Sequence, residues 1–101
     1  MNTVQVTVKY YNLVLEATKK RSETLSVPEG TTLRTLLLYL SERYGRQFRE
    51  MILSEGDASA PSVSPHARIF LDGDAVSEGI LDRSLEDGAE ISIFMAISGG
   101  S

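Results

Sequence analysis

Two runs of alternating apolar and polar residues, one near each end of the chain, constrain the fold most strongly. Residues 4–10 and residues 90–97 both alternate, and a period of two is typical of strands with one buried face. A leucine-rich segment lies between them in the sequence. We expect the two end strands to lie side by side at the centre of a mixed sheet, with a helix covering one face. The chain is therefore predicted to be an α+β roll.

The central helix is predicted from an apolar stripe that recurs every three or four residues, which forms one face of a helix. The positions of this stripe are Leu33, Leu36, Leu37, Leu40 and Tyr44. Thr31 or Thr32 can cap the first turn with its hydroxyl. Gly45 is a natural C-terminal stop. This segment is the most strongly patterned helix of the chain.

The other segments follow from turn residues and short apolar runs. In chain order we expect a mixed connection at residues 12–21, a strand at 24–27 forming a hairpin with the first strand, a short helical turn around 48–53, a surface loop at 54–65, a third strand at 68–71, a turn at 72–74 and an irregular segment at 81–87. The predicted order is thus strand, strand, helix, strand, strand.

Composition restricts the class of function. The length of 101 residues predicts one domain. A net charge of −4 argues against nucleic acid as the main partner. There is no cysteine, which excludes disulfides and thiolate chemistry on this chain. No signal peptide pattern or membrane-length apolar run is visible, so the expected location is the cytoplasm, without a membrane partner.

The last three residues, Gly99-Gly100-Ser101, are the strongest functional signal. Two glycines after an apolar strand leave a thin peptide without side chains. Such a peptide can enter a narrow channel and present a carboxylate inside another protein's active site. Ser101 blocks the carboxylate of Gly100, so the chemistry depends on that residue. The alternative for the two glycines is a frayed end or a linker of the Gly-Gly-Ser type.

The ordered set of segments resembles the MoaD/ThiS sulfur-carrier family, and MoaD more than ThiS. The matching segments are residues 8–13 with Glu16-Ala17-Thr18, residues 27–37, residues 85–91 and residues 93–100. The resemblance implies a ubiquitin-like β-grasp domain over residues 1–98 and a tail over residues 99–101. Met95-Ala96 depart from the family, which often has two prolines there, and Ser101 is an addition.

The resemblance also implies the chemistry. An adenylyltransferase of the ubiquitin-activating type would use ATP and Mg²⁺ to adenylate Gly100, with Gly99 giving access, and a sulfur donor would displace AMP. The resulting thiocarboxylate would give its sulfur to a small-molecule precursor in a larger synthase subunit. The chain would be a carrier, not catalytic alone, and would bind no cofactor or metal. With no cysteine, its carboxyl terminus is the plausible attachment point for sulfur.

Three functions stay open. The first is the small subunit of a molybdopterin synthase, or a relative that serves molybdenum or tungsten cofactor synthesis. The second is a ubiquitin-like modifier conjugated to lysines, and the third is an interaction module without terminal chemistry. Three interpretations of Ser101 stay open as well: removal by a processing protease, addition during cloning, or a branch that does not use terminal activation.

Phe94, Phe70 and Ile97 are the predicted partner-binding residues. If the isoleucines of the last strand point to the core, then Phe94 points away from it and offers an aromatic docking anchor. A shifted register would instead bury Phe94. Phe70 either extends this patch or packs in the core. His66, the only histidine, is expected to be solvated.

The acidic residues near the last strand are weaker candidates. Glu86, Asp87 and Glu90 are expected to form a solvated face, with contact to a basic rim on an activating enzyme as the alternative. The segment Asp72-Gly73-Asp74 lacks the rest of a calcium-loop pattern and predicts a turn.

Overall fold

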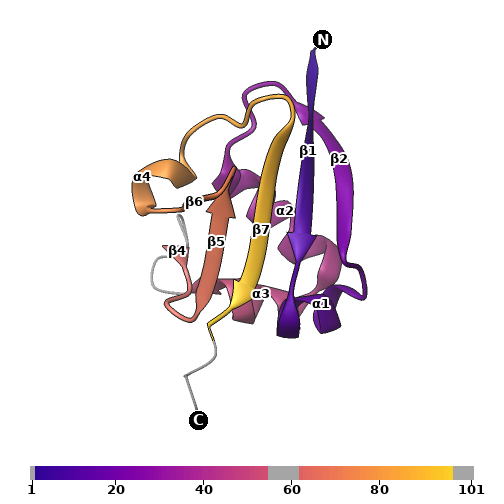
Figure 1. Ribbon diagram of the computed structural model, residues 1–101, viewed down its shortest axis with the longest axis vertical. Coiled ribbons are helices and arrows are strands. Elements are labelled where there is room, and N and C mark those ends of the chain that lie inside the picture. The colour runs from indigo at the N-terminus through magenta and orange to yellow at the C-terminus, as the bar shows by residue number, and fades with distance from the viewer. Residues whose placement is uncertain (1, 55–61, 97–101) are drawn as a thin grey trace.

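Among the described residues, five strands form one mixed sheet in the order β2-β1-β7-β5-β6. The computed structural model describes residues 2–54 and 62–96. Figure 1 shows the sheet in front, with α2 and α3 packed behind it. The elements are β1 (Thr3–Tyr10), α1 (Asn12–Thr18), β2 (Ser22–Pro28), α2 (Leu33–Tyr44), α3 (Arg46–Ile52), β3 (Leu53–Ser54), β4 (Ser62–Val63), β5 (Ala67–Leu71), β6 (Asp74–Ala75), α4 (Glu78–Leu81) and β7 (Ala89–Met95).

The two end strands are neighbours at the centre of the sheet, as the alternation predicts. β1 and β7 pair in parallel, from Val6 opposite Ala89 to Tyr10 opposite Ile93. Side chains at every second position of each strand are buried. This parallel pair joins the first and last parts of the described chain, and the predicted α+β roll is confirmed.

The connection between the first two strands is the main correction to the expected elements. Instead of a mixed connection, it contains the short helix α1, which ends at Thr18 and is followed by Lys19 in the left-handed conformation with φ 64°. Val14 and Thr18, four residues apart, are the buried positions of α1. A seven-residue helix has little stability by itself, so its packing against β7 and α3 supports it. The predicted antiparallel hairpin of β1 and β2 is confirmed.

The central helix α2 follows its predicted caps. The Thr32 hydroxyl accepts a hydrogen bond from the Thr35 amide at 3.2 Å, and Gly45 follows the helix with φ 98°. The four leucines of the stripe are buried. Tyr44 is only partly buried and uses its hydroxyl as a donor to Glu23. α3 follows directly and confirms the expected helical segment.

The remaining elements form the far edge of the structure. The turn between β5 and β6 has positive φ at Asp72 (52°) and Gly73 (91°), which confirms the predicted turn. β3 and β4 form a two-stranded ladder where the end of the helical turn and a loop were expected, and α4 and β6 are additional short elements. No described helix combines the length and apolar character that crossing a membrane requires.

A single apolar core lies between the sheet and the helices. Its largest fully buried side chains are Tyr10, Phe48, Leu33, Leu36, Leu37, Leu40, Ile52, Leu81, Ile91, Ile93, Val6 and Val8. No side-chain nitrogen or oxygen atom buried among the described residues lacks a hydrogen-bond partner. Within the described part of the chain, the core therefore buries its polar side-chain atoms only with hydrogen-bond partners.

Candidate functional site at the end of the last strand

The last strand carries the chain to one end of the sheet. β7 lies between β1 and β5, and its pairing with β5 reaches Met95 opposite Ala67. One residue further, the Ala96 amide donates to the His66 carbonyl at 2.7 Å. The sheet therefore controls the direction of the chain up to residue 96, three positions before the first residue of the predicted tail.

Asn12 holds the end of β7 from the other side. Its side-chain amide donates to the Met95 carbonyl at 3.0 Å, and its side-chain oxygen accepts from the Met95 amide at 3.1 Å. β1 ends at Tyr10, so it offers no backbone partner to Met95. The Asn12 side chain supplies the donor and the acceptor that a neighbouring strand would provide. Asn12 has φ 42°, a left-handed conformation that Asn adopts more readily than most residues. We call this pair of hydrogen bonds the Asn12 clamp.

Among the predicted site residues, the structure describes Phe94 and Phe70, whereas Ile97, Gly99 and Gly100 lie outside the described residues, as does the following serine. The two rings stack with centroids 5.7 Å apart and planes 8° apart. Both side chains are partly exposed, while the isoleucines of β7 are buried. Phe94 therefore points to the open face, and Phe70 extends the same patch instead of packing in the core.

Tyr11 completes an aromatic patch that sequence reasoning missed. Its ring meets Phe94 edge to face, with centroids 6.3 Å apart, and 45% of its surface is exposed. We call Tyr11, Phe70 and Phe94 the aromatic patch. With Asn12 and Ser92 it lines a shallow hollow. The signal that could have found it is the pair Tyr10-Tyr11, where the strand's alternation requires one ring to point outward.

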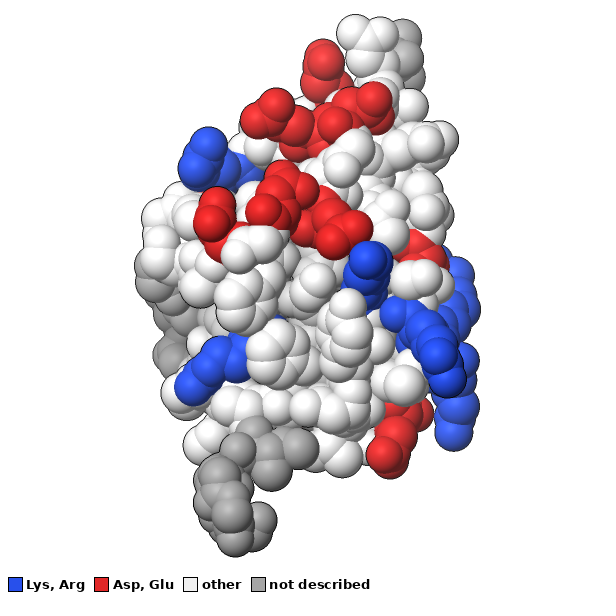
Figure 2. Space-filling view, viewed as in Figure 1, with Lys and Arg blue, Asp and Glu red and all other residues white. Residues whose placement is uncertain are grey.

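Charge is distributed unevenly around this patch. Figure 2, viewed as in Figure 1, shows Asp and Glu gathered over the upper part of the molecule and much of the Lys and Arg along its right edge, whereas the middle of the lower half is mostly uncharged, with basic side chains at its left and acidic ones at its lower right. Lys9 and Glu90 pair across the central strands at 3.2 Å. The described residues contain no group of three or more His, Cys, Asp or Glu side chains that could hold a metal ion.

Two of the acidic side chains have structural roles. Asp87 accepts a hydrogen bond from the Gln5 amide at 2.8 Å, and Asp72 accepts one from the Glu90 amide at 2.9 Å. Both carboxylates therefore bind backbone amides in the first halves of β1 and β7, away from Met95. His66 is exposed, in agreement with the expectation of a solvated side chain.

A second polar cluster surrounds Glu23, at the start of β2. Tyr10 and Tyr44 both donate their hydroxyls to this carboxylate, and Lys20 and Arg43 pair with it at 3.3 and 3.5 Å. Burial acts to raise the pKa of Glu23, but the hydrogen bonds from the two tyrosines and Lys20 outweigh it and hold this pKa below its usual value. Burial, followed by the hydrogen bond to Glu23, raises the pKa of Tyr10 and of Tyr44.

Comparison with known proteins agrees with this geometry. The sequence model of the ThiS family matches residues 8–100. The solution structure of small archaeal modifier protein 1 from Methanosarcina acetivorans superposes with a TM-score of 0.77 and 25% identity, covering 99% of this chain and 100% of that chain. A protein from Pyrococcus furiosus described as molybdopterin converting factor subunit 1 superposes with a TM-score of 0.71 and 28% identity, covering 93% of this chain and 99% of that chain.

Urm1 from Trypanosoma brucei has a TM-score of 0.73 at 19% identity, with 99% of both chains covered, and supports the fold alone. Comparison with curated proteins gives no significant match. The fold defines the class: it is the ubiquitin-like β-grasp fold of ThiS/MoaD-like sulfur carriers. Since the family model spans nearly the whole sequence, this chain belongs to the ThiS family, which includes the ThiS/MoaD-like carriers that it was expected to resemble.

Proposed function

We propose that the chain is a sulfur carrier activated at Gly100 after loss of Ser101, and that it serves molybdopterin or tungsten cofactor synthesis. The observation that carries this proposal is the family match, which extends through Gly100 in a chain without cysteine. The similarity to the Pyrococcus furiosus molybdopterin converting factor subunit favours this pathway.

The proposed chemistry has two steps on the same carboxyl group. An oxygen of the Gly100 carboxylate attacks the α-phosphorus of ATP bound with Mg²⁺ in an adenylyltransferase, and pyrophosphate leaves. Hydrosulfide then attacks the acyl carbon of the adenylate, AMP leaves with the bridging oxygen, and the resulting thioacid releases its proton to solvent to give a thiocarboxylate. Gly99 and Gly100 leave both approaches free of side chains. The chain contributes the carboxylate and its position, while the partner supplies the catalytic groups.

The aromatic patch is the proposed docking surface for the adenylyltransferase and for the larger synthase subunit. It lies beside the end of β7, so a partner that binds the patch would receive the following residues within a limited distance. Partly exposed aromatic rings are common anchors in protein interfaces. Ile97, which follows β7, would extend this contact toward the reacting end.

A protein modifier is the second candidate, because small archaeal modifier protein 1 matches over nearly the full length of both chains at 25% identity. The same adenylate would then react with lysine amines of other proteins, releasing AMP and leaving an isopeptide bond. Lysine conjugates in the host's proteins would support this function. An interaction module without terminal chemistry is the third candidate, and it predicts that deletion of residues 99–101 leaves function intact.

The first experiment is the intact mass of the protein isolated from its own host. Loss of Ser101 with one oxygen replaced by sulfur would establish the carrier function. Loss of Ser101 without sulfur would establish processing, and carrier and modifier would then be separated by the presence of lysine conjugates. Retention of Ser101 in every molecule, with no ATP-dependent activation by the host's adenylyltransferase, would overturn terminal chemistry.

A further inference from the structure

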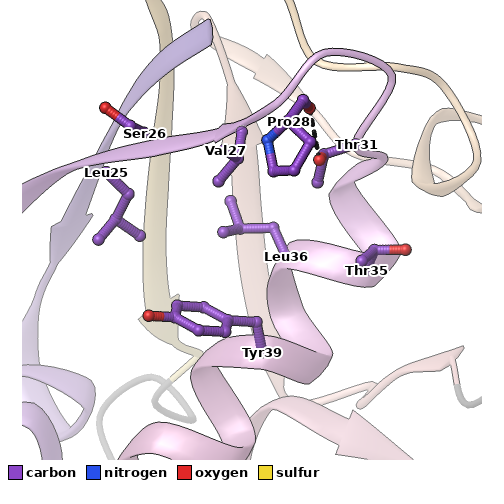
Figure 3. A pocket seen from close by; sticks show the side chains of 8 residues that line it. All are labelled: Leu25, Ser26, Val27, Pro28, Thr31, Thr35, Leu36 and Tyr39. Carbon is purple, nitrogen blue, oxygen red and sulfur yellow. Dashed lines mark hydrogen bonds between the residues drawn. The ribbon is translucent and has the colours of Figure 1, made fainter. Parts of the chain in front are cut away.

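An apolar groove lies between β2 and α2, at the edge of the sheet away from the aromatic patch. Its volume is about 290 Å³, and Figure 3 shows Leu25 and Val27 from the strand facing Leu36 and Tyr39 from the helix. Tyr39 is 48% exposed, so its ring forms an open wall. The full lining is Leu25, Ser26, Val27, Pro28, Thr31, Thr35, Leu36 and Tyr39. We call it the β2–α2 groove.

The strand beside this groove has an open backbone edge. β2 is an edge strand of the sheet that the described residues form. The Tyr10 amide donates to the Arg21 carbonyl, and the Glu29 amide donates to the Asn2 carbonyl. Because hydrogen-bonded pairs alternate along an antiparallel ladder, every second residue between Arg21 and Glu29 faces β1.

The other residues of β2 therefore turn their backbone groups outward. These are Ser22, Thr24 and Ser26, followed by Pro28, which has no amide hydrogen to donate. Outward N–H and C=O groups can pair with one more extended strand. Pro28 sets one limit of that pairing, and the turn before Ser22 sets the other. The edge accommodates a short segment of about four to five residues.

Charge distinguishes the two ends of the groove. One helical turn beyond Tyr39 lies Arg43, and two residues before Leu25 lies Glu23, so the Glu23 cluster closes this end. Lys20 and Arg43 share the single carboxylate of Glu23. Each cation keeps 40% of its side chain exposed, whereas Glu23 keeps 8%. The exposed charge at this end is therefore positive.

The opposite end of the groove carries the acidic residue Glu29, which is exposed. An acidic group on a bound peptide would be attracted at the Lys20 and Arg43 end and repelled near Glu29. The apolar walls require alternate apolar side chains, since every second residue of an added strand would point into the groove.

We propose that the β2–α2 groove binds an extended peptide segment of a partner protein, which adds to β2 as a strand with alternate apolar side chains in the groove and acidic residues beside Lys20 and Arg43. Strand addition of this kind combines backbone hydrogen bonds with side-chain pockets. The groove shares no lining residue with the aromatic patch, so we expect this binding not to depend on terminal activation. A partner held here stays attached while the tail enters another active site.

The test is an NMR titration of the full ¹⁵N-labelled chain with a capped peptide Val-Thr-Ile-Thr-Asp-Glu-Glu. The expected result is amide shift changes at Ser22, Thr24, Ser26 and Tyr39, with weaker binding in about 0.3 M salt, where exposed charges are screened. A peptide with Lys-Arg-Lys in place of the acidic residues should bind at least about tenfold more weakly. Placing the acidic residues first instead of last identifies the strand direction.

Two matched variants locate the site. Tyr39→Ala removes a half-exposed groove wall and should weaken peptide binding about tenfold. Arg46→Gln removes a charge whose side chain is 89% exposed on α3, and binding should stay unchanged. Preserved dispersion of the NMR spectrum verifies that each variant is folded. A chain lacking residues 99–101 should bind as the full chain does.

Three results would overturn the proposal. The first is shift changes confined to the aromatic patch. The second is equal binding of the acidic and basic peptides. The third is concentration-dependent shifts of the β2 amides without peptide, which would assign the edge to a second copy of this chain.

Discussion

Asn12 and Phe94 both lie beside the end of β7, but they have different roles there. Asn12 uses both atoms of its side-chain amide to replace a missing strand neighbour of Met95. Phe94 presents a ring on the face opposite the core. At the scale of single residues, one group therefore positions the chain and the other offers a contact for a partner.

Asn12→Gly should release the end of β7 without straining the backbone, because glycine accepts the left-handed conformation of residue 12. We expect at least about tenfold faster hydrogen exchange at the Met95 amide, since its acceptor is lost. Asn12→Asp keeps an acceptor for this amide and should retain most of its protection. Equal protection of Met95 in wild type and Asn12→Gly would contradict the Asn12 clamp.

The neighbouring residues Ile93 and Phe94 should respond oppositely to truncation. Ile93→Ala creates a cavity in the core and should lower the free energy of unfolding by about 2–5 kcal/mol. Phe94→Ala should lower the free energy of unfolding by less than about 1.5 kcal/mol. It should weaken binding to the adenylyltransferase by at least about tenfold. Urea unfolding and a binding titration measure the two effects. Equal losses of stability would place Phe94 in the core.

At the scale of elements, the Glu23 cluster ties three of them together. Glu23 belongs to β2, Tyr10 to β1 and Tyr44 to α2, and both tyrosines donate to the same carboxylate. The rings of these two tyrosines and of Phe48 pack against one another, with centroids 5.6–6.3 Å apart. The cluster therefore sets how the helix layer sits against the hairpin, and it forms one end of the β2–α2 groove.

The stability contributed by Glu23 should depend on pH. Its pKa is lower in the folded chain than in the unfolded chain, so its contribution is complete above the unfolded pKa, about 4.3. The contribution decreases as the pH falls from there through the folded pKa. Glu23→Gln should lower the free energy of unfolding by about 1–3 kcal/mol at pH 7, because a charged acceptor is lost.

Urea unfolding at a series of pH values checks this prediction. The difference in free energy of unfolding between wild type and Glu23→Gln should shrink as the pH is lowered. Glu50→Gln is the matched control, because Glu50 forms an exposed pair with Arg46 in α3 and should change little at any pH. A constant difference between wild type and Glu23→Gln across the acid range would refute the role of the carboxylate charge.

At the scale of the whole molecule, the first and last parts of the described chain meet in the middle of the sheet. β1 pairs with β2 on one side and with β7 on the other. The site at the tail therefore depends on a strand from the opposite end of the sequence. Because these contacts join distant residues, β7 cannot be stabilised locally before the rest of the fold forms.

Amide hydrogen exchange should show this hierarchy. The Val8 amide, in the central strand, should exchange only through global unfolding, with the free energy that urea unfolding measures. The Val76 amide, which donates to Ile69 at the edge of the sheet, should exchange through a smaller local opening. Val76 exchanging as slowly as Val8 would indicate that the β5–β6 edge is as stable as the centre.

The local patterns of this sequence determined much of the fold. Alternation in residues 4–10 specifies a strand, and the leucine stripe, with Thr32 and Gly45 at its ends, specifies α2. These signals are readable because a side chain's period along the chain directly reflects which face is buried. The order of these segments also gave the expected neighbourhood of the first and last strands, and the family resemblance added the chemistry expected of the tail.

Only the tertiary structure decided the features that depend on contacts between distant residues. α1 is too short to be stable without packing. The Asn12 clamp joins residues 83 positions apart, and the stacking of Phe70 on Phe94 requires two strands in register. No repeating pattern of residues in the sequence indicates that residue 12 lies beside Met95 or that the edge of β2 is open. Patterning determines which residues are buried, whereas the packing of strands and helices determines which of them meet.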